Sequence, residues 1–444
     1  MAHTIITHKI KPAGGGDFTT LASWEDYADG DGASIGSAAY HAECYKGGNL
    51  GKLSIGGWTH KSTPELYPKI YAAPGEEHGG DVTDGAYLDT ASNYGLLIGG
   101  HQYIVIQGLR INGSTNADQA IQVDISSRYA PVGLVVERCL IHGSFQHGIE
   151  AGLTANSQIP LESTSNIIIR NNLVRMKNTL LSSVHRTCIR VHNVNPYAGT
   201  ASINFVEHTV NANVSNNTCV LEAGCADAGR YGGIAWSVGA GHVSNITLEN
   251  NFVSLEGISD RSFRRREYGY RSDLPSATAS GVLNLTASNN AQSTNNSHPL
   301  GSGSLVGFDP NLITLSSSLE GSGNFVNPTN GNYKLGESSL LVGAGKTPTS
   351  LTTPFYKQEN DFDLAKRVQP QNLSWDIGCL EFSNKEGCIE SVKPRNNITS
   401  GSVNISNGTK NFENKKSNID NNKDSASSFD DRIRFRFSQS AGER

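Results

Sequence analysis

A short segment recurs through the middle of the chain, and this repeat constrains the fold more than any other feature. Its first clear copy is YIVIQGLRI (103–111), and GLVVERCLI (133–141) and NIIIRNNLV (166–174) repeat it residue for residue. Looser copies begin at Asn211, Asn245 and Asn284, so successive copies start 30, 33, 45, 34 and 39 residues apart. An array of this kind predicts a repeat architecture in which each unit packs on its neighbours.

The apolar residues alternate within each copy, as in Ile104/Ile106 and Ile167/Ile169. This period of two predicts a strand that is buried on one face. A second short strand is predicted ahead of each copy, because a small residue followed by an aliphatic one recurs at Gly95-Leu96, Ala120-Ile121, Gly148-Ile149, Cys188-Ile189 and Gly233-Ile234. Each coil therefore supplies at least two strands and a turn.

The connections between these strands are too short for crossover helices, so the strands can bury their apolar faces only by winding into stacked coils. The composition agrees, since 48 Gly and 41 Asn with only 17% charged residues make the chain rich in turn formers and poor in helix formers. An all-helical fold is excluded, and the predicted fold is an all-β solenoid, a parallel β-helix.

Pairs of asparagines occupy the same place in four of the copies. Asparagine tolerates left-handed backbone angles, and identical amides stacked about 4.8 Å apart on parallel strands can form a hydrogen-bonded ladder. We expect a structural ladder at this bend, formed by Asn171, Asn172, Asn216, Asn217, Asn250, Asn251, Asn289 and Asn290.

With these features the chain resembles the right-handed parallel β-helix of the pectin-lyase-like superfamily over residues 81–382. FVNPTNGNYKL (325–335), SSLLVGAG (338–345) and WDIGCLEF (375–382) resemble the closing segment of such proteins. YAAPGEEHGG (71–80) resembles the opening portion of β-helices encoded by bacteriophages and environmental bacteria. The resemblance implies a fold more than an activity, since the superfamily contains lyases, hydrolases, adhesins and viral spikes.

Three parts of the chain are predicted: an N-terminal cap and lead-in region (1–80), the β-helix with its closing segment (81–382) and a flexible Asn/Ser/Lys-rich linker with a C-terminal arm (383–444). In the first part, Leu21, Trp24 and Tyr27 are spaced as one face of a short capping helix, with Thr19 or Thr20 as its N-cap. The arm contains RIRFRF (432–437), which is either a disordered basic end or a strand that docks on a partner chain.

Catalytic candidates lie at the outward positions of the second strand. The repeat aligns Gln122, Glu150, Arg190 and Ala235 in one row and Asp124, Gly152, His192 and Ser237 in another. Asp124 and Glu150 could act as general acid and base, with Arg190 and His192 binding a sugar acid. Alternatively, Glu150 and Arg190 are only opposite charges in register, as Glu137 and Arg170 are in the row Gln107, Glu137, Arg170, Ser215, Glu249 and Ser288.

A basic and aromatic segment is predicted to be a loop between coils, and it is the candidate ligand-binding site. Arginine binds carboxylate or phosphate, and aromatic rings stack on sugars, so the segment suits an anionic glycan. A solvated loop or a subunit contact is the alternative. Its residues are Arg261, Phe263, Arg264, Arg265, Arg266, Tyr268, Tyr270 and Arg271.

No metal or cofactor is expected, because the seven cysteines are scattered and His142 and His147, which flank a predicted turn, lack a third ligand. A net charge of −5 argues against nucleic acid as a partner, and no apolar run of membrane-spanning length occurs. The N-terminal residues lack the apolar stretch of a secretory signal, so we expect synthesis in a host cytoplasm.

Two classes of function therefore remain. The first is a virion-associated protein, a phage tail-spike or fibre-like homotrimer that binds bacterial surface polysaccharide or lipopolysaccharide. The alternative is a polysaccharide lyase or glycoside hydrolase on the same scaffold, although the calcium-binding aspartates of pectate lyases and the adjacent aspartates of polygalacturonases are not evident. A bacterial surface protein that binds carbohydrate outside the cell is the third reading. The glycan and the host are not identified by the residues.

Overall fold

The computed structural model describes twenty stretches of the chain, nearly all within the strands and the turns between them. They belong to the first of two compact units, residues 1–388. The second unit, residues 389–444, includes the predicted C-terminal arm and lies outside the described residues. The described residues are 4–30, 38–56, 63, 66–90, 94–99, 103–124, 133–154, 163–177, 186–194, 208–222, 231–238, 242–255, 261–265, 282–293, 313–315, 325–327, 332–335, 339–342, 344–346 and 377–378.

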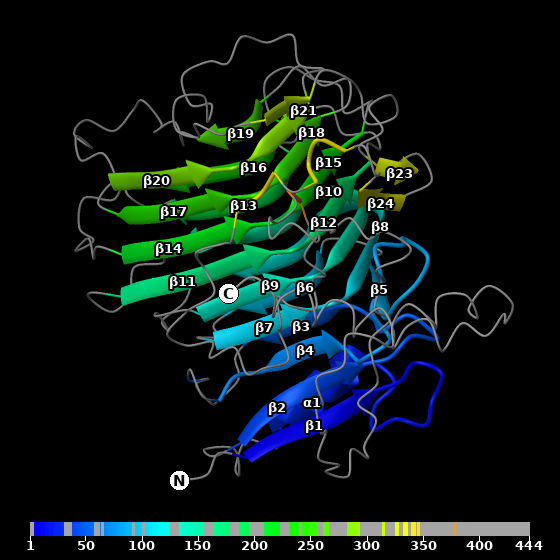
Figure 1. Cartoon of the computed structure of the whole chain (residues 1–444). Coiled ribbons are helices and arrows are strands. Elements are labelled where there is room, and N and C mark those ends of the chain that lie inside the picture. The colour runs from blue at the N-terminus through cyan, green and yellow to red at the C-terminus, as the bar shows by residue number, and fades with distance from the viewer. Residues whose placement is uncertain are drawn as a thin grey trace, which may run out of the picture. The chain divides into compact units, whose positions relative to one another are not determined.

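The described strands form two large parallel sheets, which Figure 1 shows as a stack that rises from β1 to β20. The first sheet takes one strand from each coil, in the order in which the coils follow along the chain. It consists of β1 (Thr4–Ile10), β2 (Ala38–Cys44), β4 (Lys69–Ala72), β7 (Tyr103–Gln107), β9 (Gly133–Glu137), β11 (Ser163–Arg170), β14 (His208–Ser215), β17 (Val243–Glu249) and β20 (Val282–Ser288).

The second sheet is folded across two faces of the stack, because β8 (Arg110–Asp124) and β10 (Leu140–Thr154) are long enough to pair with different strands at their two ends. The first halves of β8 and β10 belong to one row of strands, which also contains β5 (Tyr87–Thr90), β12 (Leu173–Met176), β15 (Thr218–Leu221), β18 (Phe252–Leu255), β21 (Ala291–Ser293) and β22 (Ile313–Leu315). Their second halves belong to another row, which also contains β3 (Leu53–Gly56), β6 (Tyr94–Gly99), β13 (Arg186–Val194), β16 (Tyr231–Val238) and β19 (Arg261–Arg265). The predicted all-β, parallel fold is confirmed, and these stacked sheets are compatible with a β-helix.

The register of the sheets is the one that the repeat predicted. Ile104 pairs with Leu134, and Leu134 with Ile167, while in the second sheet Ile121 pairs with Ile149 and Ile149 with Ile189. All six side chains are at most 1% exposed and belong to one core that runs through the coils. Because apolar residues lie on apolar residues of the next coil, each coil removes apolar surface from water. This burial stabilises the fold by about 25 cal/mol for each Å².

The two asparagines of each pair have different structural roles. Asn171 and Asn216 have φ values of 56° and 54°, and Gly108 and Arg138 occupy the same left-handed position in the preceding coils. The second asparagine turns its amide inward and hydrogen-bonds to the next coil, as when Asn172 Nδ2 donates to Asn217 Oδ1 at 3.0 Å. These inward amides form what we call the asparagine row: Asn172, Asn217, Asn251 and Asn290.

One helix, α1 (Leu21–Gly30), closes the end of the core next to β1 and β2. Thr20 is its N-cap, because Thr20 Oγ1 accepts a hydrogen bond from the Ser23 backbone N–H at 3.2 Å. The buried face consists of Leu21, Trp24 and Ala28, whereas Tyr27, which was predicted to share that face, is 44% exposed. Leu21, Trp24 and Ala28 are three and then four residues apart, which fits 3.6 residues per turn better than the predicted spacing of three and three that ended at Tyr27.

The stack begins earlier than the predicted boundary at residue 81. Strands β1, β2 and β4 continue the first sheet below β7, with Ile10 opposite Cys44 and Cys44 opposite Ala72. The lead-in region therefore contributes strands to the same sheet, with α1 as a cap. These strands were not predicted, because the segment that begins at Tyr103 does not recur in them.

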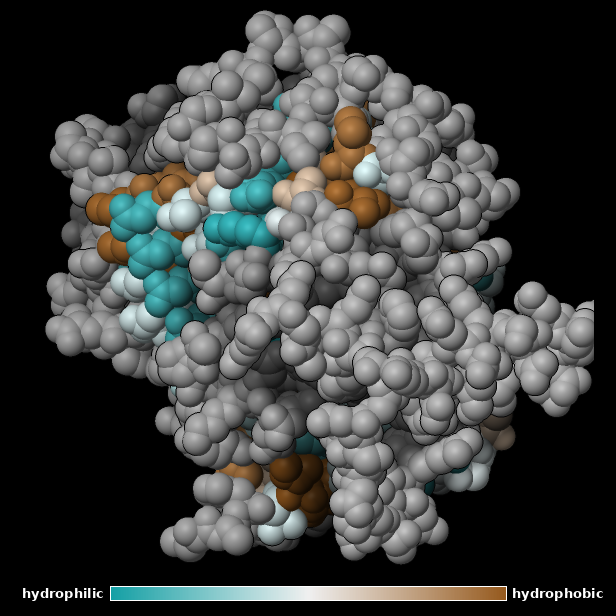
Figure 2. Space-filling view, in the orientation of Figure 1, coloured by the Kyte–Doolittle hydropathy of each residue, from teal (hydrophilic) through white to brown (hydrophobic). Residues whose placement is uncertain are grey.

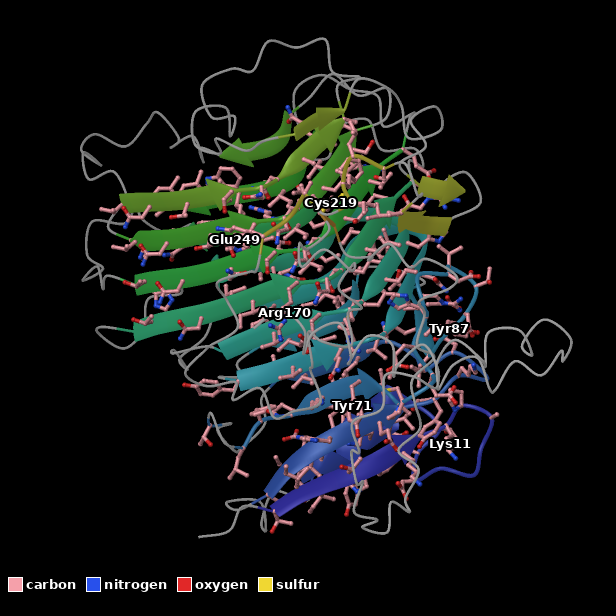
Figure 3. All side chains as sticks on the ribbon, in the orientation of Figure 1. Lys11, Tyr71, Tyr87, Arg170, Cys219 and Glu249 are labelled. Atoms are coloured by element: carbon pink, nitrogen blue, oxygen red, sulfur yellow. The ribbon has the colours of Figure 1, made fainter. Side chains whose placement is uncertain are left out.

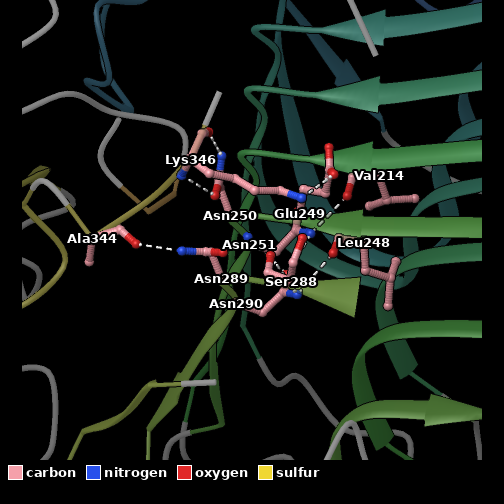
Figure 4. Close-up of polar contacts among 10 residues, drawn as sticks. All are labelled: Val214, Leu248, Glu249, Asn250, Asn251, Ser288, Asn289, Asn290, Ala344 and Lys346. Carbon is pink, nitrogen blue, oxygen red and sulfur yellow. Dashed lines mark hydrogen bonds and ion pairs between the residues drawn. The ribbon is translucent and has the colours of Figure 1, made fainter. Parts of the chain in front are cut away.

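A C-terminal strap, residues 339–342 and 344–346, crosses the outside of the bend beside the asparagines (Figure 4). Asn250 Nδ2 donates to the Lys346 carbonyl at 2.6 Å, Asn250 Oδ1 accepts from the Lys346 N–H at 2.9 Å, and Lys346 Nζ lies 2.8 Å from Glu249 Oε1. Leu341 packs against Leu140, Leu173 and Phe252 on the outer face of the second sheet. Part of the predicted closing segment thus covers an apolar outer row. The antiparallel pair β23 (Phe325–Asn327) and β24 (Asn332–Leu335) precedes the strap.

Candidate functional site

The four catalytic candidates lie on neighbouring strands of the second sheet. Glu150 in β10 pairs with Gln122 in β8 and with Arg190 in β13. Asp124 and His192 both lie opposite Gly152, one on each side of β10. The side chain of Asp124 is outside the described part of the structure, so the proposed pair of carboxylates rests on backbone register.

The Glu150 carboxylate is the centre of a buried polar cluster. Glu150 Oε1 accepts a hydrogen bond from Arg190 Nη1 at 2.7 Å and lies 3.5 Å from His192 Nδ1, and Glu150 Oε2 accepts from Gln119 Nε2 at 2.9 Å. Arg190 Nη1 also lies 3.1 Å from His147 Nε2. Burial lowers the pKa of Arg190, and the charge of Glu150 opposes that shift. Arg190 and Gln119 thus donate to one carboxylate oxygen each, which fixes the orientation of the Glu150 side chain.

Two members of this cluster were missed in the sequence, Gln119 and His147. They come directly before the aligned small-aliphatic pairs and keep the register of those pairs, so Gln119 lies opposite His147 as Ile121 lies opposite Ile149. Ala120 and Ile121 are both buried in the core, so strict alternation counted back from Ile121 places Gln119 on the wrong face. The alignment of Gln119 with His147 and Thr187 in three successive coils is the signal that could have found them.

A second buried ion pair occupies the equivalent row of the first sheet. Arg170 Nε donates to Glu137 Oε2 at 2.7 Å, and the two side chains are 3% and 0% exposed. Glu150 and Arg190 have the same order along the stack and exposures of 8% and 10%. Opposite charges in register account for both pairs, so the contact between Glu150 and Arg190 does not by itself require catalysis.

The segment predicted to be a basic loop is partly a strand. Residues 261–265 form β19, which pairs with β16 so that Phe263 lies opposite Ile234 and Arg264 opposite Ala235. Alternating side chains suit the period of a strand, and β16 offers a free edge for it. The side chains of these five residues, and the whole of Arg266, Tyr268, Tyr270 and Arg271, lie outside the described part of the structure.

The two histidines predicted to flank a turn both lie within β10, because this strand continues through the bulge. Among the side chains that the structure describes, no group of three or more His, Cys, Asp or Glu could hold a metal ion. Cys44, Cys139, Cys188 and Cys219 are buried thiols that form no disulfide among the described residues. Burial raises the pKa of the Cys139 thiol to about 12, which keeps it protonated and unreactive.

Buried histidines make the stability of the fold depend on pH. Burial lowers the pKa of His41, His78, His142, His208 and His242 to about 4. In His78, Nδ1 accepts a hydrogen bond from the Gly80 N–H at 2.9 Å, and Nε2 lies 2.7 Å from the Arg138 carbonyl oxygen. Nδ1 therefore carries no proton in the fold, and the ring is neutral.

We expect the free energy of unfolding to fall as the pH drops from about 6.5 to about 4, because over this range the unfolded chain binds protons that the folded chain does not. Each such histidine contributes up to about 1.4 kcal/mol per pH unit. Between pH 7 and pH 5, the free energy of unfolding measured in urea should therefore fall by about 1–2 kcal/mol less in His78→Gln than in the wild type. His8→Gln, at a half-buried ring, is the control, and equal losses in wild type and His78→Gln would contradict the expectation.

No protein-family model matches the chain, and no curated protein matches it. In the described part of the chain, no helix combines the length and the apolar character needed to span a membrane.

Proposed function

We propose that the chain is a right-handed parallel β-helix of the pectin-lyase-like type that serves as a virion-associated, tail-spike or fibre-like protein and binds bacterial surface polysaccharide. The observation that carries this proposal is the alignment of outward side chains from coil to coil, as in Asn166, Asn211, Asn245 and Asn284, which are joined by amide hydrogen bonds of 2.8–3.2 Å. Figure 2 shows hydrophilic side chains gathered over β14, β17 and β20. A repeating polar surface suits a ligand that is itself a repeating, extended polar chain.

Binding is favoured over cleavage by the surroundings of Glu150, which is 6% exposed. Arg190 and Gln119 donate hydrogen bonds to its carboxylate, and His192 Nδ1 lies 3.5 Å from it. An inverting hydrolase needs a protonated carboxyl and a second carboxylate about 6.5–9.5 Å away. The closeness of Glu150, Arg190 and His192 is nevertheless what an acid-sugar lyase or hydrolase would use, so cleavage is tested alongside binding.

The test is an array of purified bacterial O-polysaccharides and capsular polysaccharides, probed with the wild-type protein and with Arg264→Ala/Arg265→Ala/Arg266→Ala. We expect wild type to retain at least one acidic polysaccharide, and the triple variant to bind it about tenfold more weakly at low salt, because arginine contacts to carboxylates are charge-assisted. Lys46→Ala/Lys52→Ala is the charge control. Absence of binding by wild type would overturn the proposal.

The same polysaccharide, after incubation with the protein, is sized by chromatography. Unchanged length supports a binding protein. Shortened products that disappear with Glu150→Gln would instead establish the enzyme. Sedimentation equilibrium tests the proposed homotrimer in the same preparation.

A further inference from the structure

Half-buried aromatic side chains gather on the outer face of the first sheet in its N-terminal coils. Ala42, Cys44 and Ile70 point into the core, so their neighbours along β2 and β4 point outward. Each member of the group keeps part of its surface exposed. We call it the tyrosine patch: His41, Glu43, Tyr45, Tyr67 and Tyr71, with Tyr103 at the start of β7. Figure 3 labels Tyr71 on β4 and Lys11 near β1.

The rings of the tyrosine patch are fixed in place by their neighbours. Tyr45 Oη donates to Glu43 Oε2 at 2.7 Å, and Tyr71 Oη donates to Glu43 Oε1 at 3.4 Å. The hydrogen bond to Glu43 raises the pKa of Tyr45 to about 12, so the hydroxyl remains a donor. The His41 ring stacks on Tyr67 with centroids 6.1 Å apart and meets Tyr71 edge-on at 6.4 Å. Rings held in this way lose little conformational entropy when a ligand binds.

Charges of both signs lie around the patch, two lysines and one carboxylate, which leave one net positive charge. Lys11 Nζ lies 4.5 Å from the centroid of Tyr45, and Lys69 Nζ lies 4.6 Å from that of Tyr71. Glu43 supplies a carboxylate between these rings. Burial, assisted by the charge of Lys69, lowers the pKa of His41 to about 4, so its ring is neutral at pH 7. The patch therefore offers flat apolar surface, an acceptor and donors, without the excess of positive charge that a polyanion requires.

We infer that the tyrosine patch is a binding site for a neutral pyranose unit of the surface polysaccharide. The C–H face of the sugar packs on the exposed parts of Tyr45 and Tyr71, and its hydroxyl groups donate to Glu43 and accept from Lys69. A sugar ring with an apolar face and polar hydroxyl groups binds where aromatic rings lie beside a few suitably positioned polar side chains. The inference rests on the proposed function, but it places this contact in different coils from residues 261–271.

The test uses the polysaccharide that wild type retains on the array, with Tyr45→Ala and Tyr71→Ala. Each variant should bind about tenfold more weakly, and the loss should persist at high salt, because stacking is not screened. The matched control is Tyr94→Ala, since Tyr94 in β6 also lies beneath a lysine, with Lys52 Nζ 5.7 Å from its centroid, but on the other sheet. Tyr71→Phe should keep most of the affinity, because the ring remains.

A second measurement does not depend on the variants folding. Saturating polysaccharide should slow hydroxyl-radical oxidation of the Tyr45 and Tyr71 rings in the wild type about fivefold or more relative to Tyr94, as expected for rings covered by a ligand. Equal affinity of wild type and well-folded Tyr71→Ala, or unprotected tyrosines in the saturated wild type, would overturn the inference alone. Failure of wild type to bind any polysaccharide would overturn the proposed function together with it.

Discussion

Replacing Arg170 with Met should reduce the free energy of unfolding by about 3–5 kcal/mol, one of the two largest effects expected from a single substitution in the described residues. The reason is the Glu137 carboxylate, which is fully buried and lies 2.7 Å from Arg170 Nε. Removing the guanidinium leaves a desolvated charge with its partner lost. Urea unfolding of wild type and variant measures the change directly.

The double variant Glu137→Leu/Arg170→Met distinguishes two contributions to the free energy of unfolding: the cost of leaving Glu137 buried without its partner, and the net stabilisation by the ion pair itself. Replacing both ions by apolar groups of similar size is often neutral, so the double variant should be more stable than Arg170→Met. The exposed pair Lys46–Asp84, 3.6 Å apart with exposures of 47% and 56%, is the matched control, and Lys46→Met should change stability by less than about 1 kcal/mol. If Arg170→Met cost no more than Lys46→Met, Glu137 would have to be solvated.

The sequence predicted the later coils well, because each carries its own local signals. Alternating apolar residues fix which side chains point inward, and a shift of one residue would turn every one of them outward. The pairing of Ile104 with Leu134, and of Glu150 with Arg190, follows from this constraint alone. Aligning the copies by their apolar residues therefore also aligned the charges between them.

Other parts of the molecule depend on contacts that no local pattern records. The strap reaches Asn250 from Lys346, 96 residues further along the chain. Strands β1, β2 and β4 carry no copy of the repeated segment, so their place in the first sheet is not evident from the sequence. Gln119 reaches the polar cluster because the strand breaks its alternation at Ala120 and Ile121, which are both buried in the core.

The asparagine row is where the second large effect is expected, and Asn217→Leu is the substitution that tests it. Asn217 Oδ1 accepts from both the N–H and Nδ2 of Asn172 at 3.0 Å, and Asn217 Nδ2 donates to the Ile169 carbonyl at 2.9 Å and to Asn251 Oδ1 at 3.0 Å. Leucine has a similar volume but neither donates nor accepts. The variant removes four hydrogen bonds in a place that is 0% exposed, although Asn172 Nδ2 keeps the Val136 carbonyl and Asn251 Oδ1 keeps the Asn217 N–H.

Each lost hydrogen bond is worth about 0.5–1.5 kcal/mol, and a buried group left unsatisfied, such as the Asn172 N–H, costs about 1–3 kcal/mol. Asn217→Leu should therefore lose about 3–6 kcal/mol in urea unfolding. Asn211→Leu is the matched control, because Asn211 belongs to the outward row of amides, where it bonds to Asn166 and Asn245 at 3.2 and 2.8 Å but remains partly solvated. Water can replace those partners, so the control should lose less than about 1 kcal/mol. Equal losses in the two variants would mean that the inward amides do not join one coil to the next, and the stacking of the later coils would then depend on apolar packing and backbone hydrogen bonds alone.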